Sequence, residues 1–128
     1  MDIFADRSPL YIQKFVHDVC EYLGIIDADC ELIITPEESI EENVTGLCSG
    51  WRDWLEIKYL ARGVDRETKL LTIAHELVHA KQTILGELVV EPQLYWRGKP
   101  YIGFDQEPFY PWEEEAYRLE TEIYLECK

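Results

Sequence analysis

The sequence is poor in positive charge and in histidine. Twelve Lys and Arg residues stand against 26 Asp and Glu, which gives a formal net charge of −14, and three histidines occur among 128 residues. Because proteins that bind nucleic acid neutralise phosphates with basic side chains, this balance argues against a nucleic-acid-binding surface. Solubility is the commonest reason for such acidity, and a basic partner or mimicry of nucleic acid are the alternatives.

Other patterns are also absent. No apolar run is long enough to span a membrane, and the first residues carry no basic-then-apolar signal segment. The four cysteines form neither a C-x-x-C pair nor a zinc-finger spacing. We therefore expect free thiols in a reducing cytoplasm and no membrane partner.

The composition is that of one folded domain. Hydrophobic residues make up 47% of the chain and aromatic residues 12%, and 128 residues are enough to bury a core. No repeat or low-complexity linker interrupts the sequence. We treat residues 1–128 as a single domain.

Helical periodicity marks three segments, residues 9–23, 65–85 and 111–128. Ser8 and Asp65 are the predicted N-caps of the first two helices. Glycines follow both of these helices, as they commonly follow helix ends. The second helix has its predicted buried stripe at Leu70, Ile73, Ala74, Leu77, Ala80 and Ile84.

Strands are predicted between the first two helices. Cys30–Thr35 should end at Pro36, and Trp54–Leu60 alternates between apolar and polar residues. Thr45–Trp51 carries the glycines of a bend before this strand, and residues 96–101 have the composition of a turn or hairpin. If Trp54–Leu60 lies at a sheet edge, its open backbone can pair with an extended peptide; otherwise it is an ordinary strand.

The second helix carries the pattern H-E-x-x-H at His75, Glu76 and His79. Residues four apart on a helix lie about 40° apart around the axis and about 6 Å along it, so both imidazoles can face one metal ion. Two imidazoles at this spacing suit zinc. Glu76 flanks that position and can take a proton from a metal-bound water. The alternative is a chance occurrence on a solvated helix.

Leu71, His75, His79 and Gln82 share a face that adjoins the buried stripe. The histidines should therefore lie at the border of the core, where a cleft can form. Gln82, one turn after His79, either orients a ligand or substrate or is an ordinary surface residue.

A catalytic zinc usually has three protein ligands. No histidine follows His79, and the position where metzincins place a third histidine is Leu85. The third ligand must then be an acid, or His17 from the first helix, which otherwise is a surface or packed histidine.

The best acids open the last helix. We expect Glu113, because the small Ala116 one turn later lets this helix approach the motif helix closely. Glu115 is the second choice, and Asp105 and Glu107 are further alternatives. Acids in a first helical turn also interact favourably with the helix dipole, which accounts for some of these glutamates without a metal.

The H-E-x-x-H pattern followed by Glu113-x-Glu-Ala resembles the gluzincin type of zinc metallopeptidase. It is most similar to small zincin-like proteins of bacteria and their phages that carry a Pro-x-Glu-x-Glu-Ala segment. The resemblance covers roughly residues 51–124. It implies Zn²⁺ bound by His75, His79 and Glu113, with Glu76 as the general base.

The sequence departs from this family at Tyr117, where relatives often have an Asp or Asn that supports a histidine ligand. It also lacks the helix-turn-helix partner and basic surface expected of a DNA-damage or repressor-cleaving relative. The aromatic-rich residues 87–111 could supply a tyrosine that stabilises an oxyanion, but the sequence does not indicate which.

Together these patterns predict an α+β, minimal zincin-like fold with a small, mostly antiparallel sheet. The predicted activity is hydrolysis of a peptide or protein substrate. The alternatives are a catalytically silent, acidic zincin-like binding protein and a zinc hydrolase that acts on a non-peptide amide.

Overall fold

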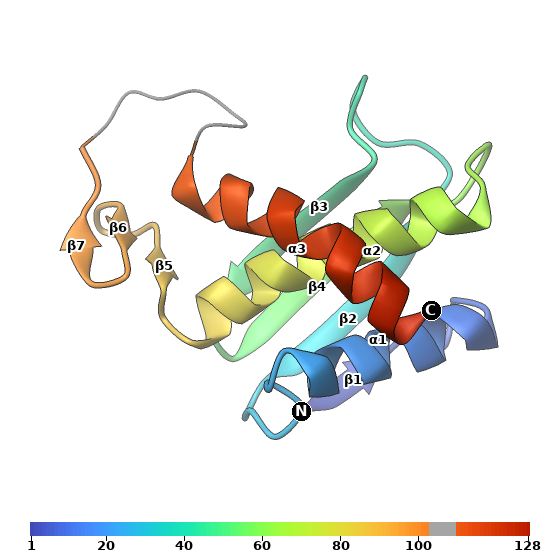
Figure 1. The fold of residues 1–128 in the computed structure, drawn as a ribbon, viewed down its shortest axis with the longest axis horizontal. Helices are drawn as coiled ribbons and strands as arrows, with labels where there is room; N and C mark the ends of the chain where they lie inside the picture. The colour runs from blue at the N-terminus through green and yellow to red at the C-terminus, as the bar shows by residue number, and fades with distance from the viewer. Residues whose placement is uncertain (103–109) are drawn as a thin grey trace.

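The computed structural model describes residues 1–102 and 110–128, which form the α+β fold shown in Figure 1. The α+β class predicted from the sequence is confirmed. In chain order the elements are β1 (Asp2–Phe4), α1 (Leu10–Tyr22), β2 (Glu31–Glu37), β3 (Gly46–Trp51), β4 (Trp54–Leu60), α2 (Arg66–Ile84), β5 (Leu88–Val89), β6 (Tyr95–Trp96), β7 (Lys99–Pro100) and α3 (Pro111–Cys127).

The main sheet has the strand order β1-β2-β4-β3. Strands β1, β2 and β4 run parallel, and β3 alone runs antiparallel to its neighbour β4. The prediction of a mostly antiparallel sheet is therefore wrong for this sheet. Helix α1 makes the crossover between β1 and β2, and such a crossover joins parallel strands. The smaller sheet, β5-β6-β7, is antiparallel.

The edge strands of the main sheet are β1 and β3, and β4 lies between β2 and β3. Of the two alternatives left open for Trp54–Leu60, the ordinary strand is therefore the one observed, and the segment expected to be a bend forms an edge strand. Pro36 also lies inside β2 instead of ending it. Strand β1 pairs with Glu31, Leu32 and Ile33 of β2 and does not reach Pro36. On the β1 side, β2 therefore has no described partner strand at Pro36, so the N–H that proline lacks costs little there.

One of the two predicted helix caps is confirmed. Asp65 caps α2, and its Oδ1 accepts a hydrogen bond from the backbone N–H of Thr68 at 2.8 Å. Ser8 is not the N-cap of α1, which is Pro9 and makes no side-chain cap. The Ser8 hydroxyl instead forms a buried 2.8 Å hydrogen bond with the Tyr59 hydroxyl, and this bond ties the start of α1 to β4.

Helix α2 lies at the centre of the fold, in contact with β3, β4, α1 and α3, and α3 crosses it (Figure 1). All six residues of the predicted α2 stripe are buried. Ala116 of α3 is fully buried, as expected if a small residue allows the two helices to approach closely. The pair α2 and α3 therefore brings two distant parts of the sequence together.

No helix among the described residues is both long and apolar enough to cross a membrane. The four cysteines are free thiols.

Candidate metal centre

The structure brings His75, His79 and Glu113 together where α3 crosses α2. One ligand atom from each residue lies within 4.8 Å of the other two, and such a group could hold a metal ion. His75 Nε2 lies 3.4 Å from Glu113 Oε1, and His79 Nε2 contacts the same oxygen. The helical spacing of the histidines and the early position of Glu113 in α3 produce this convergence.

The donor set fits a divalent cation. Glu113 is 7% exposed, and its buried Oε1 faces the Nε2 atoms of both imidazoles. A buried carboxylate oxygen is costly unless it is paired with a cation or a hydrogen-bond donor. Two imidazole nitrogens and one carboxylate oxygen are common ligands of transition metals in proteins.

Without a metal, protons stabilise this site. Burial lowers the pKa of His75, but hydrogen bonds to Glu113 and Glu120 and the charge of Glu76 outweigh burial and raise it to about 10. The pKa of His79 is raised against its own burial by Glu113 and Gln82. Burial favours the neutral form of Glu113, yet its hydrogen bonds with both histidines hold its pKa well below the usual range.

We expect the metal-free protein to lose stability as pH rises from about 6.5 to about 10. An unfolded histidine titrates near pH 6.5, whereas folded His75 titrates near 10. Its stabilising contribution is thus complete below about 6.5 and disappears as pH rises through the folded pKa. The depressed pKa of Glu113 has the opposite sign, because its contribution is present above its unfolded pKa and is lost in acid.

Thermal unfolding of chelator-treated protein across this pH range measures the effect. His75→Gln should show a flatter pH dependence, because it lacks the titrating imidazole. His17→Gln, which changes an exposed side chain of α1, is the control. Identical pH profiles for wild type and His75→Gln would contradict the assignment.

Each histidine also contacts a second residue through its other ring nitrogen. Glu120 Oε2 lies 3.4 Å from His75 Nδ1, and Gln82 Oε1 lies 2.8 Å from His79 Nδ1. Such partners orient the ring and keep Nε2 directed at a metal. Gln82 is fully buried, so the surface interpretation of this residue is wrong.

Glu120 was not predicted, although its carboxylate makes the contact with a histidine that the resemblance implies at the position of Tyr117. Tyr117 packs its ring against His75, with centroids 4.6 Å apart. Glu120 lies seven residues after Glu113, two helical turns along the same face of α3. That spacing was a usable signal once Glu113 was chosen as a ligand.

The other candidate ligands do not join this group. The Glu115 carboxylate contacts Lys81, Gln82 and Arg97 instead of the histidines. His17 is exposed on α1 beside Asp18 and Glu21. Asp105 and Glu107 lie outside the described residues.

His75, His79 and Glu113 line a cleft of about 850 Å³ between β3, α2, α3 and the chain around β5. Glu76 lies in this cleft next to the histidines and is 9% exposed. A Cβ atom at Gly46 would lie 3.1 Å from Glu76 Cγ and 2.6 Å from Thr72 Cγ2, so the edge strand passes very close to α2. Only glycine leaves room for that approach.

Strand β3 lines the cleft, and the backbone groups on one of its sides are not paired with a described strand. The backbone oxygen of Thr45 accepts a hydrogen bond from Leu60, and β3 pairs antiparallel with β4. By the alternation of such a ladder, the backbone groups of Gly46, Cys48 and Gly50 point to the opposite edge. Within the described chain no strand pairs with that edge.

Searches of family models, curated proteins and solved structures found no match to the chain.

Proposed function

We propose that the protein is a zinc-dependent peptidase with His75, His79 and Glu113 as metal ligands and Glu76 as general base. The observation that carries this proposal is the convergence of three ligand atoms within 4.8 Å, with Glu76 beside them in one cleft. Three protein ligands that leave an open position are typical of catalytic zinc sites, whereas structural sites are usually closed by four.

In this proposal one side chain transfers the proton and three others bind the cation. Zinc at this site would supply Lewis-acid chemistry, polarising the substrate carbonyl and lowering the pKa of water. Glu76 accepts a proton from the attacking water and passes it to the leaving amine. Glu113 and the two imidazoles hold the cation, and burial keeps their charges from being screened by solvent.

An extended peptide is the substrate that this cleft suits best. The open edge of β3 can add one more strand, with the backbone groups of Gly46, Cys48 and Gly50 as partners. A peptide held there passes Glu76, because Gly46 lies directly against that side chain. The apolar lining of the cleft includes Leu47, Trp51 and Trp112, which can contact substrate side chains.

The metal content of purified protein tests the ligand assignment. We expect one zinc per wild-type chain and none in His75→Ala or Glu113→Ala. Glu114→Ala, which changes an exposed acid of the same helical turn, is the matched control and should retain zinc. Absence of zinc from the wild type after zinc is offered would overturn the proposal.

Cleavage of a peptide library by the zinc-loaded protein tests the reaction. We expect turnover that disappears on chelation and returns with zinc. A protein that binds zinc and cleaves neither peptides nor other amides would be the silent binding protein instead. Cleavage of non-peptide amides alone would identify the remaining alternative.

A further inference from the structure

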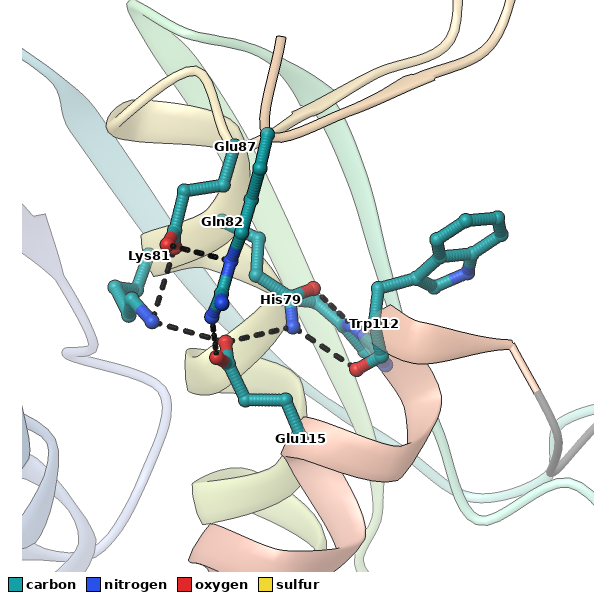
Figure 2. Close-up of polar contacts among 7 residues, drawn as sticks. His79, Lys81, Gln82, Glu87, Trp112 and Glu115 are labelled. Atoms are coloured by element: carbon teal, nitrogen blue, oxygen red, sulfur yellow. Dashed lines mark hydrogen bonds and ion pairs between the residues drawn. The ribbon is translucent and has the colours of Figure 1, made fainter. Parts of the chain in front are cut away.

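We propose that Gln82 is a positioning residue, which orients His79 for metal binding and is itself held by an ion-paired Glu115. This inference rests on the proposed metal centre. Figure 2 shows the contacts, which link His79 on α2 to Trp112 and Glu115 on α3.

The orientation of the Gln82 amide follows from its neighbours. Its Nε2 donates to the backbone oxygen of Trp112 at 2.9 Å and to Glu115 Oε1 at 3.1 Å. Both neighbours are acceptors, so they require the NH₂ end of the amide, and a flipped amide would place oxygen against oxygen. The amide oxygen must therefore face His79 Nδ1, 2.8 Å away.

This oxygen decides the tautomer of His79. An amide oxygen can only accept, so Nδ1 carries the proton. In the neutral ring Nε2 then has a free lone pair, and this is the nitrogen that faces Glu113 Oε1. Gln82 thus fixes both which nitrogen can bind a metal and where that nitrogen points.

Glu115 keeps Gln82 in place. Its Oε1 accepts from Lys81 Nζ at 2.9 Å as well as from Gln82, and its Oε2 accepts from Arg97 Nη2 at 2.6 Å. Glu115 is 6% exposed and Gln82 is fully buried. A buried carboxylate with two cationic partners is strongly localised, because leaving it unpaired is costly.

The same contacts connect the small sheet to the metal centre. Lys81 Nζ lies 2.9 Å from Glu87 Oε1, just before β5, and the Arg97 backbone N–H donates to the Glu87 backbone oxygen at 2.6 Å. Arg97 directly follows β6 and reaches Glu115 on α3. Glu115, the second-choice ligand, is therefore assigned a role two residues removed from the metal, acting through Gln82 and His79.

Zinc affinity of Gln82→Met tests the proposal, since methionine has similar shape but cannot accept from Nδ1–H or donate to Glu115. We expect affinity to fall roughly 10- to 100-fold, the usual effect of losing a partner behind a metal ligand. The protected Nδ1–H resonance of His79 in the zinc-loaded protein should be lost. Glu114→Gln, at an exposed position of α3, should leave both measurements unchanged.

A double exchange separates positioning from general destabilisation. Gln82→Glu with Glu115→Gln restores an acceptor for His79 and a donor between the two side chains, and leaves the net charge unaltered, but it loses the hydrogen bond to the Trp112 backbone oxygen. We expect it to recover part of the lost affinity, whereas Gln82→Met should not, even under conditions where both variants are fully folded by circular dichroism.

The outcomes are distinct. Wild-type affinity in folded Gln82→Met would overturn the role of Gln82. A double exchange that binds zinc as weakly as Gln82→Met would overturn the requirement for an acceptor. Failure of the wild type to bind zinc would instead overturn the metal centre on which the inference rests.

Discussion

Glu76→Gln is expected to reduce peptide hydrolysis by about 10²- to 10⁴-fold, the usual contribution of a general base. The amide has nearly the shape of the carboxylate but cannot take a proton from water. Glu76 lines the cleft and contributes charge at both histidines, and it does not belong to the group of converging ligand atoms. Zinc content should therefore stay at one per chain.

Single-turnover cleavage and metal content, measured on the same preparations, separate these two effects. Glu67→Gln changes an exposed acid in the first turn of the same helix and serves as the control. An unchanged cleavage rate would show that Glu76 is not the base. Loss of zinc together with activity would show that Glu76 supports the site in some other way.

Gly46→Ala should impair both stability and turnover. The added methyl group would lie 2.6 Å from Thr72 Cγ2 and 3.1 Å from Glu76 Cγ, well inside normal contact distance. Relief requires β3 to move away from α2 or the two side chains to turn aside. Such overpacking typically costs about 1–3 kcal/mol, and either movement shifts Glu76 relative to the edge of β3 where we propose that a peptide binds.

Thr72→Ser removes the methyl group that makes the closer contact and keeps the hydroxyl, so it is the matched compensating change. Urea unfolding should show that Gly46→Ala is less destabilising in the Thr72→Ser background than in the wild type. Turnover should recover less fully, since the contact with Glu76 remains. Strictly additive effects of the two substitutions would contradict the close approach of β3.

In α2 the features that depend on local sequence were predicted well, whereas the predicted cap at Ser8 and strand end at Pro36 were wrong. The boundaries of α2 follow from the Asp65 cap and the glycine after the helix, which act over a few residues. The pairing of His75 with His79 needs only helical geometry. Glu113 could be chosen because Ala116 indicated a close helix crossing, and the structure places this residue, and not Glu115, beside the histidines.

Features that depend on contacts between distant segments were missed. Strand direction is set by how the chain crosses the sheet, and the three-residue β1 is too short to give a pattern of its own. Glycines at positions 46 and 50 suggested a bend, yet Gly46 serves close packing of an edge strand against α2. The contacts of Gln82 and Glu120 arise only after α3 has crossed α2.

The contacts between Glu113 and the histidines have a consequence for folding. They lie at the α2–α3 crossing, where the buried Ala116 also packs, so the protein's own side chains hold this crossing together. Small zinc fingers, by contrast, remain unfolded until they bind their ion. In this fold a cation at the proposed centre would bind to a helix crossing that packing and ion pairs already hold together, so we expect its removal to leave the fold intact.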